Sequence, residues 1–321
     1  MTWTRRQRWK NDAIYAAAVA AVKLGLALPR GWLPHVGSLL GWAAHLLLPR
    51  VRRTTLANLA LIHPDAAPAA RRALARQVYR CLGRDLTDTV ALLDPEESPG
   101  RTLVLPRESH DVLTSALRRG RGVVYATCHL GPWERMAALL AAEGFPITTV
   151  ARESYDQRFH PLLYERVRNK RNIEVIYRGD PGASFAIVRA LRRGRVLGFL
   201  LDLPGRVTTR QVRWLGHPAP VAVGPARIAL RTGSPIVVGT PAHLLGDDRL
   251  CVHIASLRAD DLPPGDEGEA ELTQRMADAL SERIRSLPAH WPWMHPSFVN
   301  GSTPAEAATP QPGPQTRTDE A

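Results

Sequence analysis

The feature that most constrains this chain is the alternation of short apolar, β-branched runs with amphipathic segments between residues 122 and 287. Short apolar runs bounded by glycine, proline or charge are typical of strands, and longer segments with helical spacing separate most of them. The alternation predicts an α/β fold with a mixed, mainly parallel sheet flanked by helices. The predicted strands are Gly122–Cys128, Ile147–Arg152, Ile173–Tyr177, Val196–Leu201, Ile236–Gly239 and Leu250–Leu257, and the predicted helices are Pro132–Glu143, Asp156–Arg171, Gly182–Arg193, Val223–Arg231 and Glu267–Leu287.

The N-terminal region differs from the rest of the chain in charge and hydropathy. Residues 1–53 hold nine Lys or Arg against one acid, Asp12, within a chain whose net charge is +12. Apolar stretches at Ala13–Leu28 and Gly31–Pro49 lie between these charges, which favours an anionic membrane surface over nucleic acid as the partner. We expect one or two helices lying in or dipping into the membrane surface, with a true span over the second stretch as the alternative.

The remaining chain divides into a globular domain and a tail. A helical pattern near Ala67–Leu93 opens a soluble domain predicted over residues 54–299, and proline-rich residues 300–321 are predicted to be disordered. The three cysteines lack a C-x-x-C pair, which suits a reducing compartment and buried apolar positions. His290 and His295 lie in a proline-broken segment and make poor metal partners, so no metal site is predicted.

The candidate catalytic residues lie in the segment Val123–Leu140. Its β-rich run ends at Cys128, His129 stands in the turn that follows, and Pro132 occupies the first position of a predicted helix. His129 is therefore expected at the carboxyl end of a strand, where open α/β sheets bind ligands. Glu134 falls in the first turn of that helix, from which it can fold back towards His129.

A histidine and a carboxylate in this arrangement can serve as a general base. The imidazole accepts a proton near neutral pH, and a carboxylate at its other ring nitrogen fixes the tautomer and stabilises the imidazolium. The spacing of His129 and Glu134 alone fits a structural histidine equally well. The chain has no G-x-S-x-G motif, and Cys128 should face the core because neighbouring strand residues point to opposite faces.

The sequence around His129 resembles the H-x4-D/E block of the glycerolipid acyltransferase superfamily. Over residues 10–299 the chain resembles the lipid A late acyltransferases, the lauroyl and myristoyl transferases of the bacterial inner membrane. Four further stretches carry this resemblance: Arg53–Leu59 with Pro64 and Asp65; Val150–Arg152 with Arg166–Ile176; Leu201 and Asp202 with Trp214–Gly216 and Val223–Ala226; and Arg285–His295.

This resemblance implies transfer of a fatty acyl group from acyl carrier protein, or from acyl-coenzyme A, to a hydroxyl of a lipid A precursor. The location it implies is the cytoplasmic face of the bacterial inner membrane, and it implies no metal or organic cofactor. His129 would be the general base, with Glu134 as its orienter or charge partner. An arginine at Arg166 or Arg168 would contact Glu134 or the donor phosphate.

Further residues are candidates for substrate binding. Arg152 and Asp202 match functional positions of the family, and Arg206 follows the same strand end, where a phosphate-binding role competes with a solvated surface role. The chain departs from the family pattern at Glu153, where proline is usual, and at residues 203–205, which replace a polar run. These departures leave the identities of donor and acceptor open.

Two other functions remain open from the sequence. One is acylation of a mannosyl phosphoinositide or another lysolipid, and the other is lipid binding by an inactive membrane protein of the same fold. The glutamate that ends the H-x4-D/E block favours lipid A, and the presence of both catalytic-type residues disfavours an inactive protein. Trp291, Trp293 and Phe298 fit either core packing or a lipid-facing belt, with packing favoured.

Overall fold

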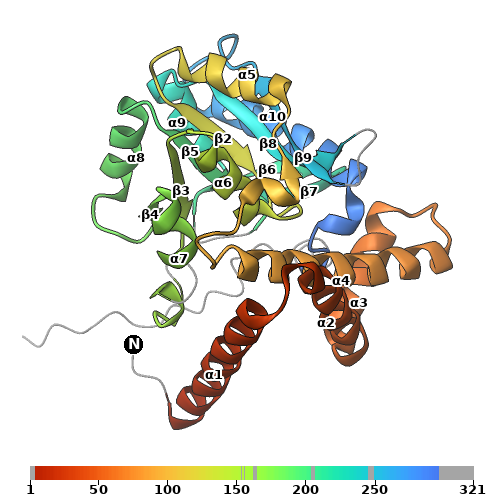
Figure 1. Cartoon of the computed structure of the whole chain (residues 1–321). Helices are drawn as coiled ribbons and strands as arrows, with labels where there is room; N and C mark the ends of the chain where they lie inside the picture. The colour runs from red at the N-terminus through yellow and green to blue at the C-terminus, as the bar shows by residue number, and fades with distance from the viewer. Residues whose placement is uncertain are drawn as a thin grey trace, which may run out of the picture.

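Seven strands form the central sheet, in the spatial order β1 (Leu103–Val104), β9 (Leu250–Leu257), β8 (Ile236–His243), β2 (Val123–Thr127), β5 (Val196–Leu200), β3 (Ile147–Ala151) and β4 (Glu174–Tyr177) (Figure 1). This computed structural model describes residues 4–152, 154, 156–161, 165–203, 207–244 and 249–295. Strands β8, β2, β5, β3 and β4 are parallel, β9 runs antiparallel to β8, and β1 runs parallel to β9. The predicted mixed, mainly parallel sheet is confirmed.

The six predicted strands correspond to β2, β3, β4, β5, β8 and β9, and two further features were not predicted. The short edge strand β1 is one, and the hairpin of β6 (Thr209–Trp214) and β7 (His217–Ala222) is the other. Leu215 and Gly216 form its two-residue turn with φ values of 53° and 92°, the backbone sign that a type I′ hairpin turn requires. Pro218 and Pro220 interrupt the alternation of apolar and polar residues in β7, so this strand was not predicted.

Helices cover both faces of the sheet. Helices α5 (Arg107–Leu117) and α6 (Trp133–Ala142) pack on one face, and α8 (Ala183–Arg192), α9 (Gly224–Thr232) and α10 (Asp266–Ser286) pack on the other (Figure 1). All five residues of β2 are buried, and they alternate between the two faces. Tyr125 packs with α5 and α6, whereas Ala126 and Cys128 join the opposite core. The predicted inward orientation of Cys128 is therefore confirmed.

The helix predicted over Asp156–Arg171 is found in part: residues 159–161 have helical backbone, and residues 162–164 lie outside the described residues. The structure places α7 at Glu165–Arg168, followed by a 3₁₀ turn at Asn169–Arg171. At the predicted start, the Asp156 carboxylate accepts hydrogen bonds from the backbone and the guanidinium of Arg158. A carboxylate bonded to the backbone two residues later stabilises a local turn in competition with a helix.

Four helices precede the sheet: α1 (Arg5–Ala27), α2 (Leu33–Leu47), α3 (Pro49–Ile62) and α4 (Pro68–Ala91). Helices α2 and α4 cross at very short range because glycines face each other. A Cβ atom at Gly83 would lie 2.0 Å from the Gly37 carbonyl oxygen, and one at Gly41 would lie 2.0 Å from the Tyr79 carbonyl oxygen. Such small-residue contacts let helix backbones approach closely.

Helix α1 extends away from the α/β body, and α2 and α3 lie beside it at the same end of the molecule (Figure 1). The boundary predicted after residue 53 falls inside α3. None of the described helices contains a stretch long and apolar enough to cross a membrane. The tail predicted over residues 300–321 lies outside the described residues.

Candidate active site

The candidate site lies at the carboxyl ends of β2 and β5, the adjacent central strands. Thr127 of β2 pairs with Leu200 of β5, so His129 and Asp202 each follow two residues beyond a matched pair. Parallel strands end at the same edge of a sheet, and this edge is where such folds bind ligands. The chain then turns at Gly131, whose φ of 58° suits glycine, and enters α6.

His129 and Asp202 form a hydrogen-bonded pair. The Nδ1 atom of His129 lies 2.8 Å from Oδ1 of Asp202, and the backbone N–H of His129 donates to Oδ2 at 2.9 Å. The indole Nε1–H of Trp291 also donates to Oδ2, at 2.9 Å. Burial opposes ionisation of Asp202, but the charge of His129 and these hydrogen bonds outweigh it and lower the pKa of the carboxyl.

This geometry sets the chemistry that His129 can perform. An ionised carboxylate at Nδ1 holds the proton there and leaves Nε2 as the free proton-accepting nitrogen. The imidazole retains 20% exposure while the Asp202 side chain is fully enclosed. The Trp133 ring packs edge-to-face on the imidazole with centroids 4.9 Å apart, which further restrains its orientation.

Glu134 pairs with an arginine. Its Oε1 lies 2.6 Å from Nη2 of Arg168, and its Oε2 accepts from Nε of the same guanidinium at 3.3 Å. Glu134 is predicted as the orienter or charge partner of His129, but the carboxylate at Nδ1 belongs to Asp202. Helix α6 places its first turn beside α7, where Arg168 extends into the wall of the site.

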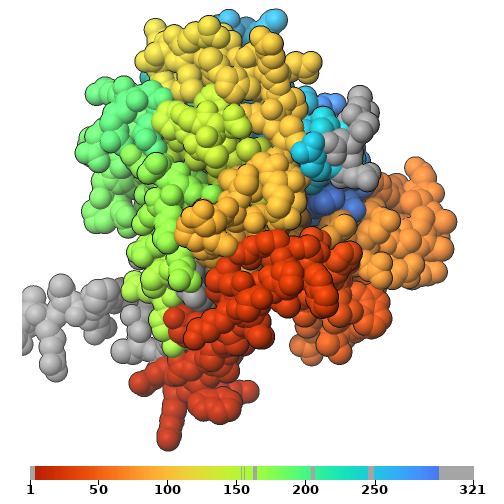
Figure 2. Space-filling view, viewed as in Figure 1, coloured from red at the N-terminus to blue at the C-terminus, as the bar shows by residue number. Residues whose placement is uncertain are grey.

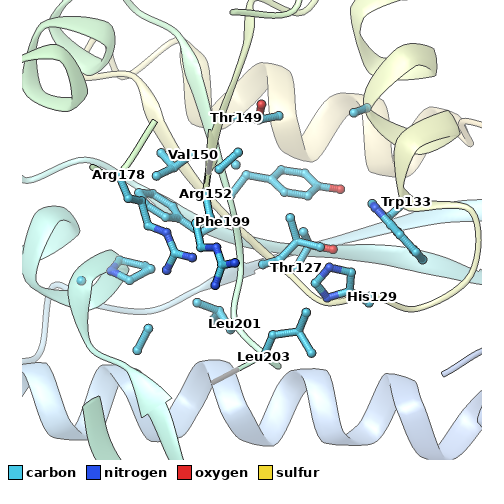
Figure 3. Close-up of a pocket in the computed structure, with 18 of the residues that line it drawn as sticks. Thr127, His129, Trp133, Thr149, Val150, Arg152, Arg178, Phe199, Leu201 and Leu203 are labelled. Carbon is cyan, nitrogen blue, oxygen red and sulfur yellow. The ribbon is translucent and has the colours of Figure 1, made fainter. Parts of the chain in front are cut away.

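A cavity of about 780 Å³ opens beside His129 (Figure 3). Its wall contains both His129 and Glu134, together with side chains of the sheet and of α6. A lining of this kind, mostly apolar with a few polar groups, is typical of a ligand site. The apolar lining includes Tyr125, Met136, Leu140, Ile147, Val150, Phe199, Leu201 and Val223.

Two arginines lie side by side in the cavity wall, Arg152 after β3 and Arg178 after β4 (Figure 3). Among the described residues, neither has a carboxylate partner. Partial burial and the neighbouring charge of Arg152 lower the pKa of Arg178. Two unpaired cations at one edge of an apolar cavity create a local positive potential that favours an anionic group.

The remaining predicted arginines have different positions. Arg168 reaches the cavity and contacts Glu134, which decides between the two arginines that the sequence analysis left open. Arg166 is exposed on α7 and contributes nothing to the described cavity wall. Arg206 and Phe298 lie outside the described residues.

Sequence reasoning missed the role of the segment after α10. Trp291 and Trp293 are fully buried, so a lipid-facing position is excluded for both and the packing interpretation is correct. Trp291 contacts Asp202, and the buried amide of Asn58 donates to the carbonyls of Trp293 and His295, at 2.7 Å each. The polar Asn58 within an apolar helical pattern was the one sequence signal that could have indicated a buried contact for this segment.

The cysteines, all among the described residues, are buried. Burial raises the pKa of the Cys128 thiol well above its ordinary value, so this cysteine stays protonated. Cys81 and Cys251 are also buried free thiols. Within the part of the chain that the structure describes, no cluster of His, Cys, Asp and Glu could hold a metal ion.

Comparison with known proteins points to one family. Residues 4–300 match the family described as bacterial lipid A biosynthesis acyltransferase. The chain is 30% identical over 195 residues to the phosphatidylinositol mannoside acyltransferase of Mycobacterium tuberculosis, covering 59% of this chain and 58% of the relative. It is 29% identical over 197 residues to the protein of the same description from Mycolicibacterium smegmatis, covering 59% and 60%. The match thus spans less than two thirds of the length of these relatives.

Proposed function

We propose that this chain, which belongs to the bacterial lipid A biosynthesis acyltransferase family, is an O-acyltransferase that joins a fatty acyl group to a hydroxyl of a membrane glycolipid. The observation that carries this proposal is the His129–Asp202 pair at the edge of an apolar cavity. The pair supplies a base, and the cavity supplies a place for an acyl chain. An inactive lipid-binding protein would have no need of an imidazole oriented by a buried carboxylate.

In the proposed reaction, Nε2 of His129 removes the proton from the acceptor hydroxyl as its oxygen attacks the thioester carbonyl carbon. Asp202 stabilises the imidazolium that forms. The tetrahedral intermediate then expels the thiolate, which takes the proton from Nε2 and leaves as a thiol. The products are an ester and a free thiol, and the base returns to its starting form.

Glu134 acts through Arg168 in this proposal. The carboxylate holds the guanidinium in the cavity wall with two hydrogen bonds, so that positive charge stands near the reacting carbonyl. A fixed donor stabilises the negative oxygen of a tetrahedral intermediate more effectively than a mobile one. Backbone N–H groups at the start of α6 are the other candidate donors for that oxygen.

The donor is proposed to be acyl carrier protein or acyl-coenzyme A, both of which present the thioester on a phosphopantetheine arm. Arg152 and Arg178 support a phosphate-bearing substrate because they are unpaired cations among the described residues. Replacing Arg178 by Ala should raise KM for the substrate whose phosphate it binds by about tenfold, with little change in kcat. The Arg189→Ala variant, on the exposed face of α8, is the matched control.

Two acceptors fit this chemistry. A lipid A precursor is favoured by the family description, and a mannosyl phosphoinositide is favoured by the mycobacterial relatives. Both are glycolipids with a free hydroxyl and a phosphate. The pairwise similarity to the mycobacterial proteins makes the mannosyl phosphoinositide, or another lysolipid, a serious second candidate.

The first two helices are proposed to bind an anionic membrane, which would place the enzyme at the cytoplasmic face of the bacterial inner membrane. These helices form one end of the molecule (Figure 2), and large apolar side chains remain exposed on them. Basic residues of α1 flank them, as expected for a helix at an anionic lipid surface. The exposed apolar surface of α2 and the turn before it consists of Trp32, Leu39, Leu40, Trp42, Leu46 and Leu47.

The decisive experiment is reconstituted acyl transfer. The purified full chain is mixed in detergent with acyl carrier protein or coenzyme A thioesters of graded chain length, and with phosphatidylinositol mannoside or a hydroxylated lipid A precursor. A product heavier by one acyl group, measured by mass spectrometry, identifies donor, chain length and acceptor together. The His129→Ala variant should lose on the order of 10² to 10⁴ in rate. Full transfer by this variant, or no product from any pair, contradicts the proposal.

A further inference from the structure

The segment 288–295, here called the C-terminal strap, fastens the active site to the N-terminal helices. It begins with the 3₁₀ turn η5 (Pro288–His290) after α10. Asn58 of α3 donates from one amide nitrogen to two strap carbonyls, those of Trp293 and His295. The Trp293 indole donates back to the Pro288 carbonyl at 2.7 Å, which closes the strap on itself.

On its other side, the strap contacts the site at two points. The backbone N–H of Gly131, in the turn between His129 and α6, donates to the His290 carbonyl at 2.9 Å. The Trp291 indole donates to Oδ2 of Asp202 at 2.9 Å. Trp291 is completely buried, and its ring meets that of Trp293 edge-to-face with centroids 4.9 Å apart. The indole that reaches Asp202 is therefore held in one orientation.

We propose that Trp291 is a positioning residue for acyl transfer, whose indole N–H holds the Asp202 carboxylate in line with His129. This inference rests on the proposed function, because it assigns how the general base is kept aligned. Oδ2 of Asp202 accepts from the backbone of His129 and from Trp291, so the carboxylate cannot rotate without breaking a hydrogen bond. Oδ1 is thereby kept for Nδ1 of the imidazole.

The N–H of Trp291 also affects how tightly the pair binds a proton. A donor to a carboxylate stabilises its ionised form, so removing that donor makes the His129–Asp202 pair hold a proton more strongly. The acid limb of the rate profile, where protonation of the pair stops catalysis, should then move to higher pH. A loss of packing alone would lower the rate at every pH without moving the limb.

The groups that face the pair must be considered in that titration. The Cys128 thiol, directly after β2, stays protonated. Burial lowers the pKa of His295 on the strap, which keeps its imidazole neutral near pH 7. Across the cavity, the charges of Glu134 and Arg168 are paired with each other. The His129–Asp202 pair is thus the expected source of the acid limb.

The test compares two tryptophans of the strap. Trp291→Phe removes the donor to Asp202, and Trp293→Phe removes an indole of equal burial that donates to a backbone carbonyl instead. For Trp291→Phe we expect kcat/KM to fall about tenfold and the acid limb to rise by about half a pH unit or more. For Trp293→Phe we expect lower thermal stability and an unmoved acid limb.

The pH profiles of the two variants decide whether Trp291 positions Asp202. An unmoved acid limb in Trp291→Phe overturns the inference, and so does an equal shift in both variants. If Trp291→Phe does not fold, the wild-type chain is titrated by ¹⁵N-resolved NMR, with the Trp291 indole signal assigned from its contact with the Trp293 ring. That signal should move through the titration of the pair, and a flat response overturns the inference. The NMR result needs no turnover, so it stands even if the acyl transfer assay fails.

Discussion

The α/β body and the N-terminal helices use apolar side chains in opposite ways. In the body, every residue of β2 is buried and the side chains fill two cores, one on each face of the sheet. In the helices, Trp9, Trp32 and Leu47 are 80%, 63% and 76% exposed. Helices α2 and α4 instead hold together through backbone contact at glycines.

This difference separates the side chains that stabilise the fold from those left exposed for the proposed membrane binding. Burial of apolar surface stabilises the fold, so large side chains of the body cannot be removed without destabilisation. The exposed tryptophans and leucines of the helices contribute little to folding and remain available for another apolar surface. The polar site lies in the body, where rigid strand ends can hold two side chains within hydrogen-bonding distance.

The largest expected effect is on the chemistry of the body. The Asp202→Asn variant keeps the shape of the side chain but removes the charge that stabilises the imidazolium of His129. The acyl transfer rate should fall by about 10² to 10⁴, while binding to anionic vesicles stays as in the wild type. Stopped assays and vesicle flotation measure the two quantities. If Asp202→Asn lost both acyl transfer rate and vesicle binding, the two regions would not have separate roles.

The next effect is on how the helices pack. In Gly83→Ala, the added Cβ atom would lie only 2.0 Å from the Gly37 carbonyl oxygen, so α2 and α4 must move apart. We expect the free energy of unfolding to fall by about 1 to 3 kcal/mol. Gly31→Ala is the control, because nothing lies within 4 Å of its Cβ position. Equal denaturation midpoints for the two variants would show that the glycine contact is unimportant.

A smaller effect is expected at the exposed apolar surface. Trp32→Ser should weaken partition into phosphatidylglycerol vesicles by about tenfold, because a large apolar side chain no longer enters the lipid. Transfer to acceptor in detergent micelles should hardly change. Phe185→Ser, which alters a residue 83% exposed on α8, should leave partition intact. A similar loss in both variants would mean that the surface of α2 has no special affinity for lipid.

The last effect concerns the junction between the two regions and develops only as the pH rises above neutral. Burial opposes protonation of His290, but Asp85 and Cys81 of α4 outweigh it and raise its pKa to about 9. Since this pKa lies above the unfolded value of about 6.5, the interaction stabilises the fold fully below pH 6.5 and is lost as pH rises through 9. The free energy of unfolding should fall over this window by at most about 3 kcal/mol, because each pKa unit corresponds to about 1.4 kcal/mol.

Chemical denaturation at a series of pH values checks this expectation. The His290→Gln variant should lack the alkaline decrease. His295→Gln, which alters a strap histidine whose pKa is lowered by burial, should retain it. An alkaline decrease that survives in His290→Gln assigns the effect to other groups.

Much of the sheet could be predicted because its signals are local. Strands β2 and β5 are short apolar runs between glycines or charges, and their predicted ends fall within one residue of the observed ones. The hairpin at residues 209–222 was missed because arginines and prolines interrupt its alternation. The helix predicted from Asp156 begins later than expected, because the Asp156 side chain bonds the nearby backbone and stabilises a turn.

The structure brings together part of the predicted site, and its role in catalysis stays a prediction. The cavity is lined or adjoined by His129, Glu134, Arg152, Arg168 and Asp202, whereas Arg166 is not in its wall and Arg206 lies outside the described residues. Their partners differ from expectation, because a glutamate five residues away looked closer than an aspartate 73 residues away. The hydrogen bond from Trp291 to Asp202 could not be predicted from the neighbouring residues, because a tryptophan that only packs in the core has the same sequence context.

Local periodicity determined where this chain forms strands and which of its polar residues stand just beyond their ends, because burial on two faces imposes a pattern on neighbouring residues. Only the tertiary structure decided that β2 lies next to β5, and therefore that Asp202 rather than Glu134 meets the imidazole of His129. The order of strands depends on packing between segments far apart in the chain, and no single segment carries that information.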